Sequence, residues 1–142
     1  MSIVSAVAVA VVFVWLGMIL AISFIEAPLK FRAPNVTLAI GLGIGRLVFR
    51  ALNTLEAGWA AIVVVTIVLG LPGAGTTVAL TVAVFALAVQ VIAVRPQLTR
   101  RSDAVIAGLD APRSHAHYVY IALEVVKAIA LLVGGIALLA AA

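Results

Sequence analysis

The sequence predicts an all-α integral membrane protein, an antiparallel bundle of four transmembrane helices. Three observations predict this fold class. Hydrophobic residues make up 66% of the 142 residues and charged residues 10%, whereas soluble domains have about 45–50% apolar and about 25% charged residues. Four apolar stretches are long enough to cross a hydrocarbon core of about 30 Å. Segments rich in proline, glycine or charge separate them. This composition excludes a soluble enzyme and a disordered chain, because a soluble globule of this size could not bury so much apolar surface.

The first expected span covers residues 3–25, an almost unbroken apolar run that includes Trp15. A cleaved signal peptide is the alternative interpretation of this run. No Lys or Arg precedes Lys30, and the run is longer than the apolar core of about 7–15 residues in a signal peptide. We therefore expect it to remain as a transmembrane helix. Pro28 and Pro34 are expected to break any helix that follows it.

The second expected span, residues 50–69, is the last part of a longer helix. Residues 37–69 have a helical pattern throughout, and at 1.5 Å per residue they would extend about 50 Å, more than a bilayer core needs. The first part of this helix is therefore assigned to the membrane interface. Residues 26–49 as a whole form the first connection between spans.

The second half of the chain contains the other two spans. Residues 70–75, GLPGAG, predict a tight turn without charge. The third span is expected at residues 76–94, and Arg95–Pro96 is expected to close it. Residues 95–115 form a polar, basic second connection, and residues 116–140 form the fourth span. The whole chain is thus one membrane domain.

The basic residues predict the orientation. Four lie between the first two spans and four between the last two, and none lies in the 70–75 turn or at either terminus. By the positive-inside rule, both basic connections face the cytoplasm and both termini face outward. This placement accounts for the net charge of +4, and we expect no nucleic-acid partner, because the basic residues lie between hydrophobic spans. Alanine and valine richness with Arg favoured over Lys indicates a GC-rich bacterial genome, and we expect the protein to lie in a bacterial inner membrane.

Ionisable and amide side chains near or within the spans all fall in the cytoplasmic half. A charge inside a span costs about 2.5–3.5 kcal/mol on insertion scales, so it usually faces the bundle interior or water. The outer half offers only hydroxyl groups. The pattern predicts a polar crevice that is open to the cytoplasm and closed outward by apolar packing. Its candidate residues are Glu26, Arg46, Arg50, Asn53, Glu56, Gln90, Glu124 and Lys127.

Helical spacing gathers these residues into two stripes. On the second span the stripe is Arg46, Arg50, Asn53 and Glu56, and on the fourth it is His117, Tyr120, Glu124 and Lys127. We predict ion pairs of Glu56 with Lys127 and of Glu124 with Arg46 or Arg50. Two interpretations stay open: the charges only hold the helices together, or they form a ligand or proton site.

Metal and nucleotide sites have weaker support. His115 and His117 point to nearly opposite sides of a helix and could share an ion only in an extended stretch. One axial haem ligand per chain, or ligation shared across a dimer, remains an alternative; no cofactor is otherwise expected. The chain has no Cys. The glycines of GLGIG, Gly41 to Gly45, lack the spacing of a dinucleotide loop. Gly41 and Gly45, like Gly134–Gly135, instead favour close helix packing.

Two segments resemble known membrane proteins. The stretch that contains Ser23–Phe24, Ala27–Pro28 and Lys30–Phe31, and the closing segment from Arg95 to Leu132, are similar to a family of small bacterial four-span membrane proteins of unassigned function. More distantly, the first stretch resembles the animal transmembrane protein family associated with cisplatin resistance. A looser likeness links such bundles to copper-resistance and haem-biosynthesis membrane proteins, whose intramembrane histidines are absent here. The resemblance implies the four-span fold and no activity.

Three functions fit these observations. The first is a small carrier or ligand-binding membrane protein, in which arginines receive an anionic group and glutamates relay a proton or receive a cation. The second is an accessory or assembly subunit of a larger membrane complex, or a homodimer, which uses its apolar faces and glycines. The third is a haem- or metal-linked membrane oxidoreductase. The dry outer half argues against an open channel, and an enzyme is the less favoured class.

Overall fold

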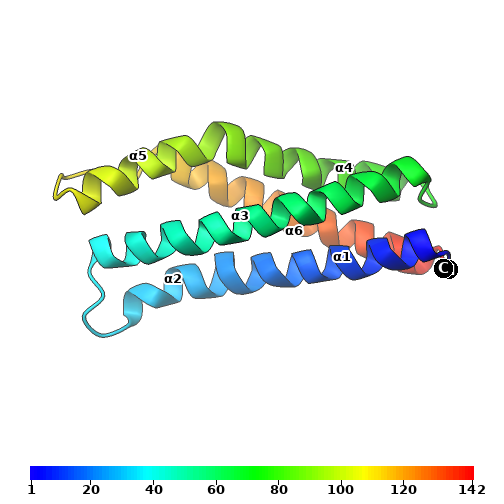
Figure 1. Cartoon of the computed structure of the whole chain (residues 1–142), viewed down its shortest axis with the longest axis horizontal. Helices are drawn as coiled ribbons and strands as arrows, with labels where there is room; N and C mark the ends of the chain where they lie inside the picture. The colour runs from blue at the N-terminus through cyan, green and yellow to red at the C-terminus, as the bar shows by residue number, and fades with distance from the viewer.

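The computed structural model describes residues 1–142 and consists of four long helical rods that run antiparallel. Figure 1 shows the rods side by side, with the tight turn near residue 70 at one end and the two longer connections at the other. Each rod is long and apolar enough to cross a membrane, so the predicted four-span bundle is confirmed and the chain is a multi-pass membrane protein. The rods are Ile3–Arg32, Leu38–Leu69, Ala74–Ile106 and His115–Ala140.

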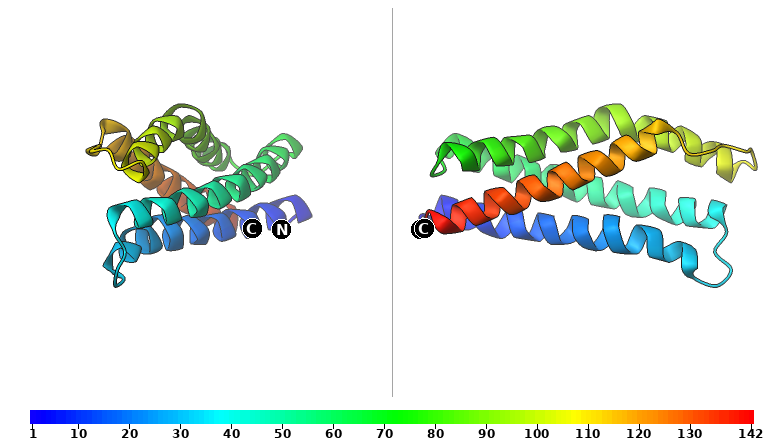
Figure 2. Two further views of the ribbon diagram at one scale, coloured as in Figure 1. Left: turned by 60° about the vertical axis from the view of Figure 1, so that its left-hand side comes forward. Right: turned by 180° about the vertical axis from the view of Figure 1, so that it is seen from behind.

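The two ends of the bundle differ in charge. The connections at residues 33–37 and 107–114 lie at the end that carries eight of the nine Lys and Arg residues, which we call the basic end. The two termini and the uncharged turn at residues 70–73 lie at the opposite, apolar end, where Figure 2 shows the termini close together.

The first rod does not stop at Pro28, and the expectation that this proline breaks the helix is wrong. The rod consists of α1 (Ile3–Ile19), the π-helical turn η1 (Leu20–Glu26), α2 (Ala27–Leu29) and the 3₁₀ turn η2 (Lys30–Arg32). In the π turn the Ala27 N–H donates five residues back, to the Ile22 carbonyl. Pro28 then lies in the first turn of the resumed helix, where its missing N–H is tolerated.

The third rod repeats this arrangement at Pro96. It consists of α4 (Ala74–Val89), the π turn η3 (Gln90–Val94) and α5 (Arg95–Ile106). The Arg95 N–H donates to the Gln90 carbonyl, and Pro96 again lies in the first turn of the next helix. Arg95–Pro96 therefore bends the rod, as Figure 1 shows, without closing it. Most of the 95–115 segment that we expected to be a connection is helix.

The other two rods are single helices. α3 (Leu38–Leu69) begins at Thr37, whose hydroxyl accepts a hydrogen bond from the Ile40 N–H at 3.2 Å, and its length confirms the helix expected over residues 37–69. α6 (His115–Ala140) follows the second connection. α6 packs against α4 and α1, α1 packs against α3, and α3 contacts α5. The four rods therefore enclose a common interior.

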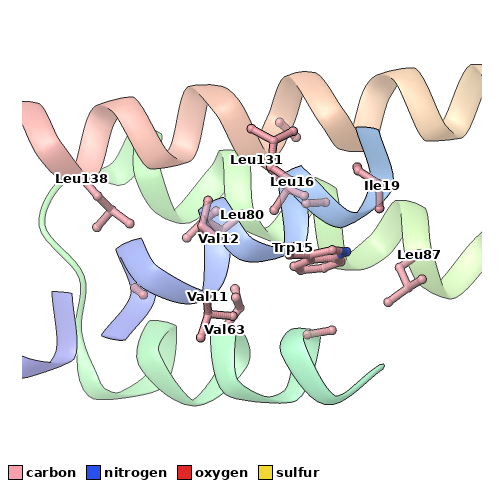
Figure 3. Packing of buried hydrophobic residues seen from close by; sticks show 14 residues of the cluster. Val11, Val12, Trp15, Leu16, Ile19, Val63, Leu80, Leu87, Leu131 and Leu138 are labelled. Atoms are coloured by element: carbon pink, nitrogen blue, oxygen red, sulfur yellow. The ribbon is translucent and has the colours of Figure 1, made fainter. Parts of the chain in front are cut away.

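The apolar half of that interior is filled by side chains from all four rods. Figure 3 shows Trp15, Leu80 and Leu131 in its centre, with Val63 below and Leu138 toward the termini. The cluster has 14 buried apolar residues. Because apolar helices gain little hydrophobic free energy by leaving lipid, this close packing is what holds them together.

Glycines allow the closest approaches, as predicted. A methyl group on Gly134 would lie 2.5 Å from Leu80 Cδ2 of α4, and one on Gly135 would lie 2.7 Å from Phe13 Cζ of α1. At the basic end a methyl group on Gly41 would overlap the ring of Phe31. These glycines pack within the bundle.

Candidate functional site: a basic cavity above a buried ion cluster

A cavity of about 1100 Å³ lies between the rods at the basic end. Its walls come from η1 to η2, α3, η3, α5 and α6, so every rod contributes. Six of the residues that line it carry a positive charge, whereas Glu124 is the single carboxylate among them. The cationic residues are Lys30, Arg46, Arg50, Arg95, Arg101 and Arg113.

A buried ion cluster lies at the inner end of this cavity. Lys127 Nζ lies 2.5 Å from Glu56 Oε1 and 2.6 Å from Glu124 Oε1, and it donates a hydrogen bond to Gln90 Oε1 at 2.8 Å. The side chains of Lys127 and Glu56 are fully buried and that of Glu124 is 2% exposed. We call Lys127, Glu56, Glu124 and Gln90 the ion cluster. It joins α3, α6 and η3 near the middle of the bundle.

Neutral side chains form the other hydrogen bonds of the cluster. Trp15 of α1 donates its indole N–H to Glu56 Oε1 at 2.9 Å. Ser23 of η1 donates its hydroxyl to Glu124 Oε2 at 2.7 Å. Gln90 donates its amide N–H to the Tyr120 carbonyl at 3.2 Å. All four rods thus hold the cluster, as a charge in a low-dielectric interior requires.

Arg95 lies between the ion cluster and the cavity. Its guanidinium stacks on two rings, with its central carbon 5.0 Å from the Phe49 centroid and 4.6 Å from that of Tyr120. The side-chain amide of Asn53 is oriented with its oxygen toward Arg95 and its nitrogen toward Glu56. It accepts a hydrogen bond from Arg95 Nε at 3.2 Å and donates one to Glu56 Oε2 at 3.1 Å. The buried Nη2 of Arg95 has no hydrogen-bond partner in the protein. This guanidinium is therefore fixed in position and retains an unused donor.

Other predicted residues lie farther from the cluster. Glu26 pairs with Lys30 on its own rod at 3.7 Å. Arg46 pairs with Asp103 of α5 at 2.6 Å. Arg50 lines the cavity and forms no ion pair. The outer part of the cavity wall thus retains positive charge that no carboxylate balances.

The structure confirms one predicted ion pair and corrects the other. Glu56 and Lys127 form the predicted pair. The prediction that Glu124 pairs with Arg46 or Arg50 is wrong, because Glu124 contacts Lys127 of its own helix. Arg46 precedes Glu56 by ten residues of helix, about 15 Å at 1.5 Å per residue, so it lies nearer the end of the bundle. Its carboxylate partner there is Asp103, on the helix that we expected to be a connection.

The histidines do not come together with other metal-ligating side chains. His115 is exposed at the start of α6, whereas His117 is half-buried and lines the cavity. His117 packs edge-on against Tyr118, with ring centroids 5.4 Å apart. The structure contains no group of three or more His, Cys, Asp or Glu residues positioned to hold a metal ion.

Sequence reasoning missed three members of the site. Trp15 was placed only within the first apolar run, although a buried indole N–H needs an acceptor, which is a signal for a polar partner. Ser23 had no clear signal, because a hydroxyl in a span usually bonds to its own helix. Arg95 was assigned to the end of the third span. The structure places it at the start of α5, directly after the π turn, where it lines the cavity.

The fold and the site define a multi-pass membrane protein with four spans and a buried ion cluster beneath a basic cavity. Comparisons with protein-family models, with curated protein sequences and with solved structures found no match.

Proposed function

We propose that this protein is a small carrier or ligand-binding membrane protein that takes an anionic molecule into the cavity at its basic end. The observation that carries the proposal is the charge of the wall, six cationic side chains against one carboxylate. That carboxylate, Glu124, already has Lys127 as its counter-ion. A cavity with one sign of charge and apolar surroundings concentrates ligands of the opposite sign.

The apolar part of the wall supports an organic anion over a small inorganic one. Phe24, Phe31 and Phe49 line the cavity together with Leu42 and Leu98. The volume of about 1100 Å³ is slightly above the range for pockets that bind small molecules, about 300–1000 Å³. A carboxylate, phosphate or sulfonate group on an apolar or aromatic body fits this combination.

A carrier also needs a second opening, which would form at the apolar end of the bundle. In this conformation the interior beyond the ion cluster is filled by the apolar core. We propose that this arrangement is the carrier state that is open at the basic end. Movement of the ion cluster would have to accompany any opening toward the apolar end.

We propose that the chain is a member of the small four-span family that the sequence resembles. We also propose that its basic end faces the cytoplasm from a bacterial inner membrane. The chain has no native cysteine, so single cysteines report the orientation directly. Ala74→Cys, at the exposed start of α4 next to the apolar-end turn, is expected to react with a membrane-impermeant maleimide on intact spheroplasts. Ser114→Cys is expected to react only after lysis, and the reverse pattern would overturn this orientation.

The binding proposal is tested with two aromatic probes of similar shape. The protein is placed in nanodiscs of neutral phosphatidylcholine and titrated calorimetrically with benzenesulfonate and with benzenesulfonamide, its uncharged analogue. We expect the sulfonate to bind at least about tenfold more tightly, because one charge-assisted hydrogen bond contributes about 1.5 kcal/mol or more. Equal binding of the two probes, or no binding of the sulfonate, would overturn the proposal.

A matched pair of variants locates the binding. Arg50→Gln removes an unpaired charge from the cavity wall and is expected to weaken sulfonate binding about tenfold. Arg100→Gln removes the same charge from α5 outside the wall and is expected to have little effect. Equal losses in the two variants would indicate nonspecific attraction to the basic end. Uptake of benzenesulfonate into proteoliposomes then distinguishes a carrier from a binding protein.

A further inference from the structure

Four charged groups form one connected network at the inner end of the cavity. Lys127 contacts both Glu56 and Glu124, and Asn53 links Glu56 to Arg95. With every group ionised, two positive charges balance two negative ones and the network is neutral. In a buried site this balance matters, because an uncompensated charge there is strongly destabilising.

Arg95 is the member of the network that an anion in the cavity can reach. It lines the cavity, whereas Lys127 and Glu56 do not. Its guanidinium is held by two rings and by Asn53, and its Nη2 donor has no partner. An anionic oxygen that binds this guanidinium adds one negative charge to the network, which then has a net charge of −1 when it is counted apart from Arg50, Arg101 and Arg113 of the outer wall.

Glu124 is the member that a proton in the cavity can reach. It is the one carboxylate of the network in the cavity wall. Its ionised or protonatable neighbours are Lys127 and Tyr120 on α6 and Glu56 on α3, and Ser23 of η1 donates a hydrogen bond to it. Arg95 joins the same network through Asn53 and Glu56, and Gln90 joins it through Lys127. His117 lies seven residues before it on α6 and also lines the cavity.

From this arrangement we infer that the protein binds its anionic ligand together with one proton, which Glu124 takes up. The inference rests on the proposed function, since it concerns the same cavity. The anion binds at Arg95, a proton from the cavity water adds to the Glu124 carboxylate, and the network returns to neutrality. No covalent bond other than this O–H bond forms. Release of the anion returns the proton to the cavity.

The coupling has a defined sign. Because the bound state holds one more proton than the free state, lower pH favours binding. Linkage also requires the reciprocal effect, so that the bound anion raises the affinity of Glu124 for its proton by the same factor. A carrier built in this way would move an anion and a proton in the same direction without net charge.

The experiment counts protons during binding. Benzenesulfonate stays ionised at all physiological pH values, so any proton taken up from the buffer during binding is bound by the protein and not by the probe. Wild-type protein in neutral nanodiscs is titrated with this probe in buffers of different ionisation enthalpy, and the slope of the observed enthalpy gives the number of protons. We expect an uptake approaching about one proton per probe and an affinity that rises up to about tenfold per unit decrease in pH.

Variants identify the group that takes the proton. Glu124→Gln is expected to bind benzenesulfonate with no proton uptake and with an affinity independent of pH. Glu56→Gln, which removes one negative charge from the same network, is also expected to bind without uptake, so the inference stays testable if one variant does not fold. Asp110→Asn, in the exposed second connection, is the control and is expected to retain the uptake.

The outcomes separate the two proposals. No binding of benzenesulfonate by wild-type protein would overturn the proposed function. Binding without proton uptake would overturn only the coupling. Uptake that persists in Glu124→Gln but disappears in His117→Gln would assign the proton to the histidine and overturn the role of Glu124.

Discussion

The two halves of this bundle show opposite ways of using the space between four helices. In the apolar half, 14 apolar side chains are buried and glycines bring α4, α6 and α1 into close contact. In the basic half, the corresponding cluster has three members, Val94, Ala116 and Tyr120, and a cavity of about 1100 Å³ occupies the interior. Helices in lipid stay together where their surfaces interlock. The apolar half therefore holds the bundle closed, and the basic half is free to remain open.

The π turns mark the boundary between the two halves. Each lies just before a proline, η1 before Pro28 and η3 before Pro96. A π turn widens the helix and is frequent at functional sites. Here the two turns place Ser23 and Gln90 against the ion cluster. Beyond them, η2 and α5 contribute Lys30 and Arg95 to the cavity wall.

The largest loss of stability is expected from a change to Lys127, the cation at the boundary between the two halves. Lys127→Met leaves the carboxylates of Glu56 and Glu124 buried without a counter-ion, and we expect it to lower the free energy of unfolding by about 3–5 kcal/mol. Thermal unfolding in a mild detergent measures the loss. The triple variant, in which Glu56→Gln and Glu124→Gln accompany Lys127→Met, is expected to recover most of it. An unchanged melting temperature in the single variant would show that the cluster contributes nothing to folding.

A smaller loss is expected from the indole that joins the two halves. Trp15→Phe keeps an aromatic ring in the core but removes the N–H that donates to Glu56 at 2.9 Å. Hydrogen bonds to charged groups contribute about 1.5–3 kcal/mol, and the free energy of unfolding of the variant should fall by a similar amount. The matched control is Trp59→Phe, whose N–H contacts the weak acceptor Met18 Sδ at 3.2 Å. Equal losses in the two variants would mean that the rings, and not the bond to Glu56, account for the effect.

The smallest of the three effects tests the packing of the apolar half alone. Gly134→Ala places a methyl group against Leu80, and overpacking of this kind costs about 1–3 kcal/mol. Gly58→Ala is the control, because a methyl group there meets no atom within 4 Å. The control is expected to be neutral or slightly stabilising, since alanine favours helix. If unfolding in detergent shows the same stability for both variants, close packing at Gly134 is not what holds α4 to α6.

The fold and part of the site could be predicted because both depend on local sequence patterns. Hydropathy alone identifies the four rods, since a helix that crosses lipid needs an apolar surface along its whole length. Helical spacing placed Glu56, Glu124 and Lys127 on inward faces, and their depth suggested that Glu56 meets Lys127. The helix breaks at Pro28 and Pro96 were predicted wrongly, because the rule for proline assumes an uninterrupted α-helical hydrogen-bond ladder. A preceding π turn removes the conflict.

By itself the sequence determined that the chain crosses the membrane four times, that its charges gather toward one end, and that three ionisable groups lie deep within the spans. Only the tertiary structure decided which charges meet. Lys127 pairs with both carboxylates, Asp103 pairs with Arg46, and Arg95 lies between the cavity and the cluster. The physical reason is that spacing along a helix fixes only the face and the depth of a side chain. Its partner depends on how neighbouring rods bend and pack, and here the two π turns control the bending.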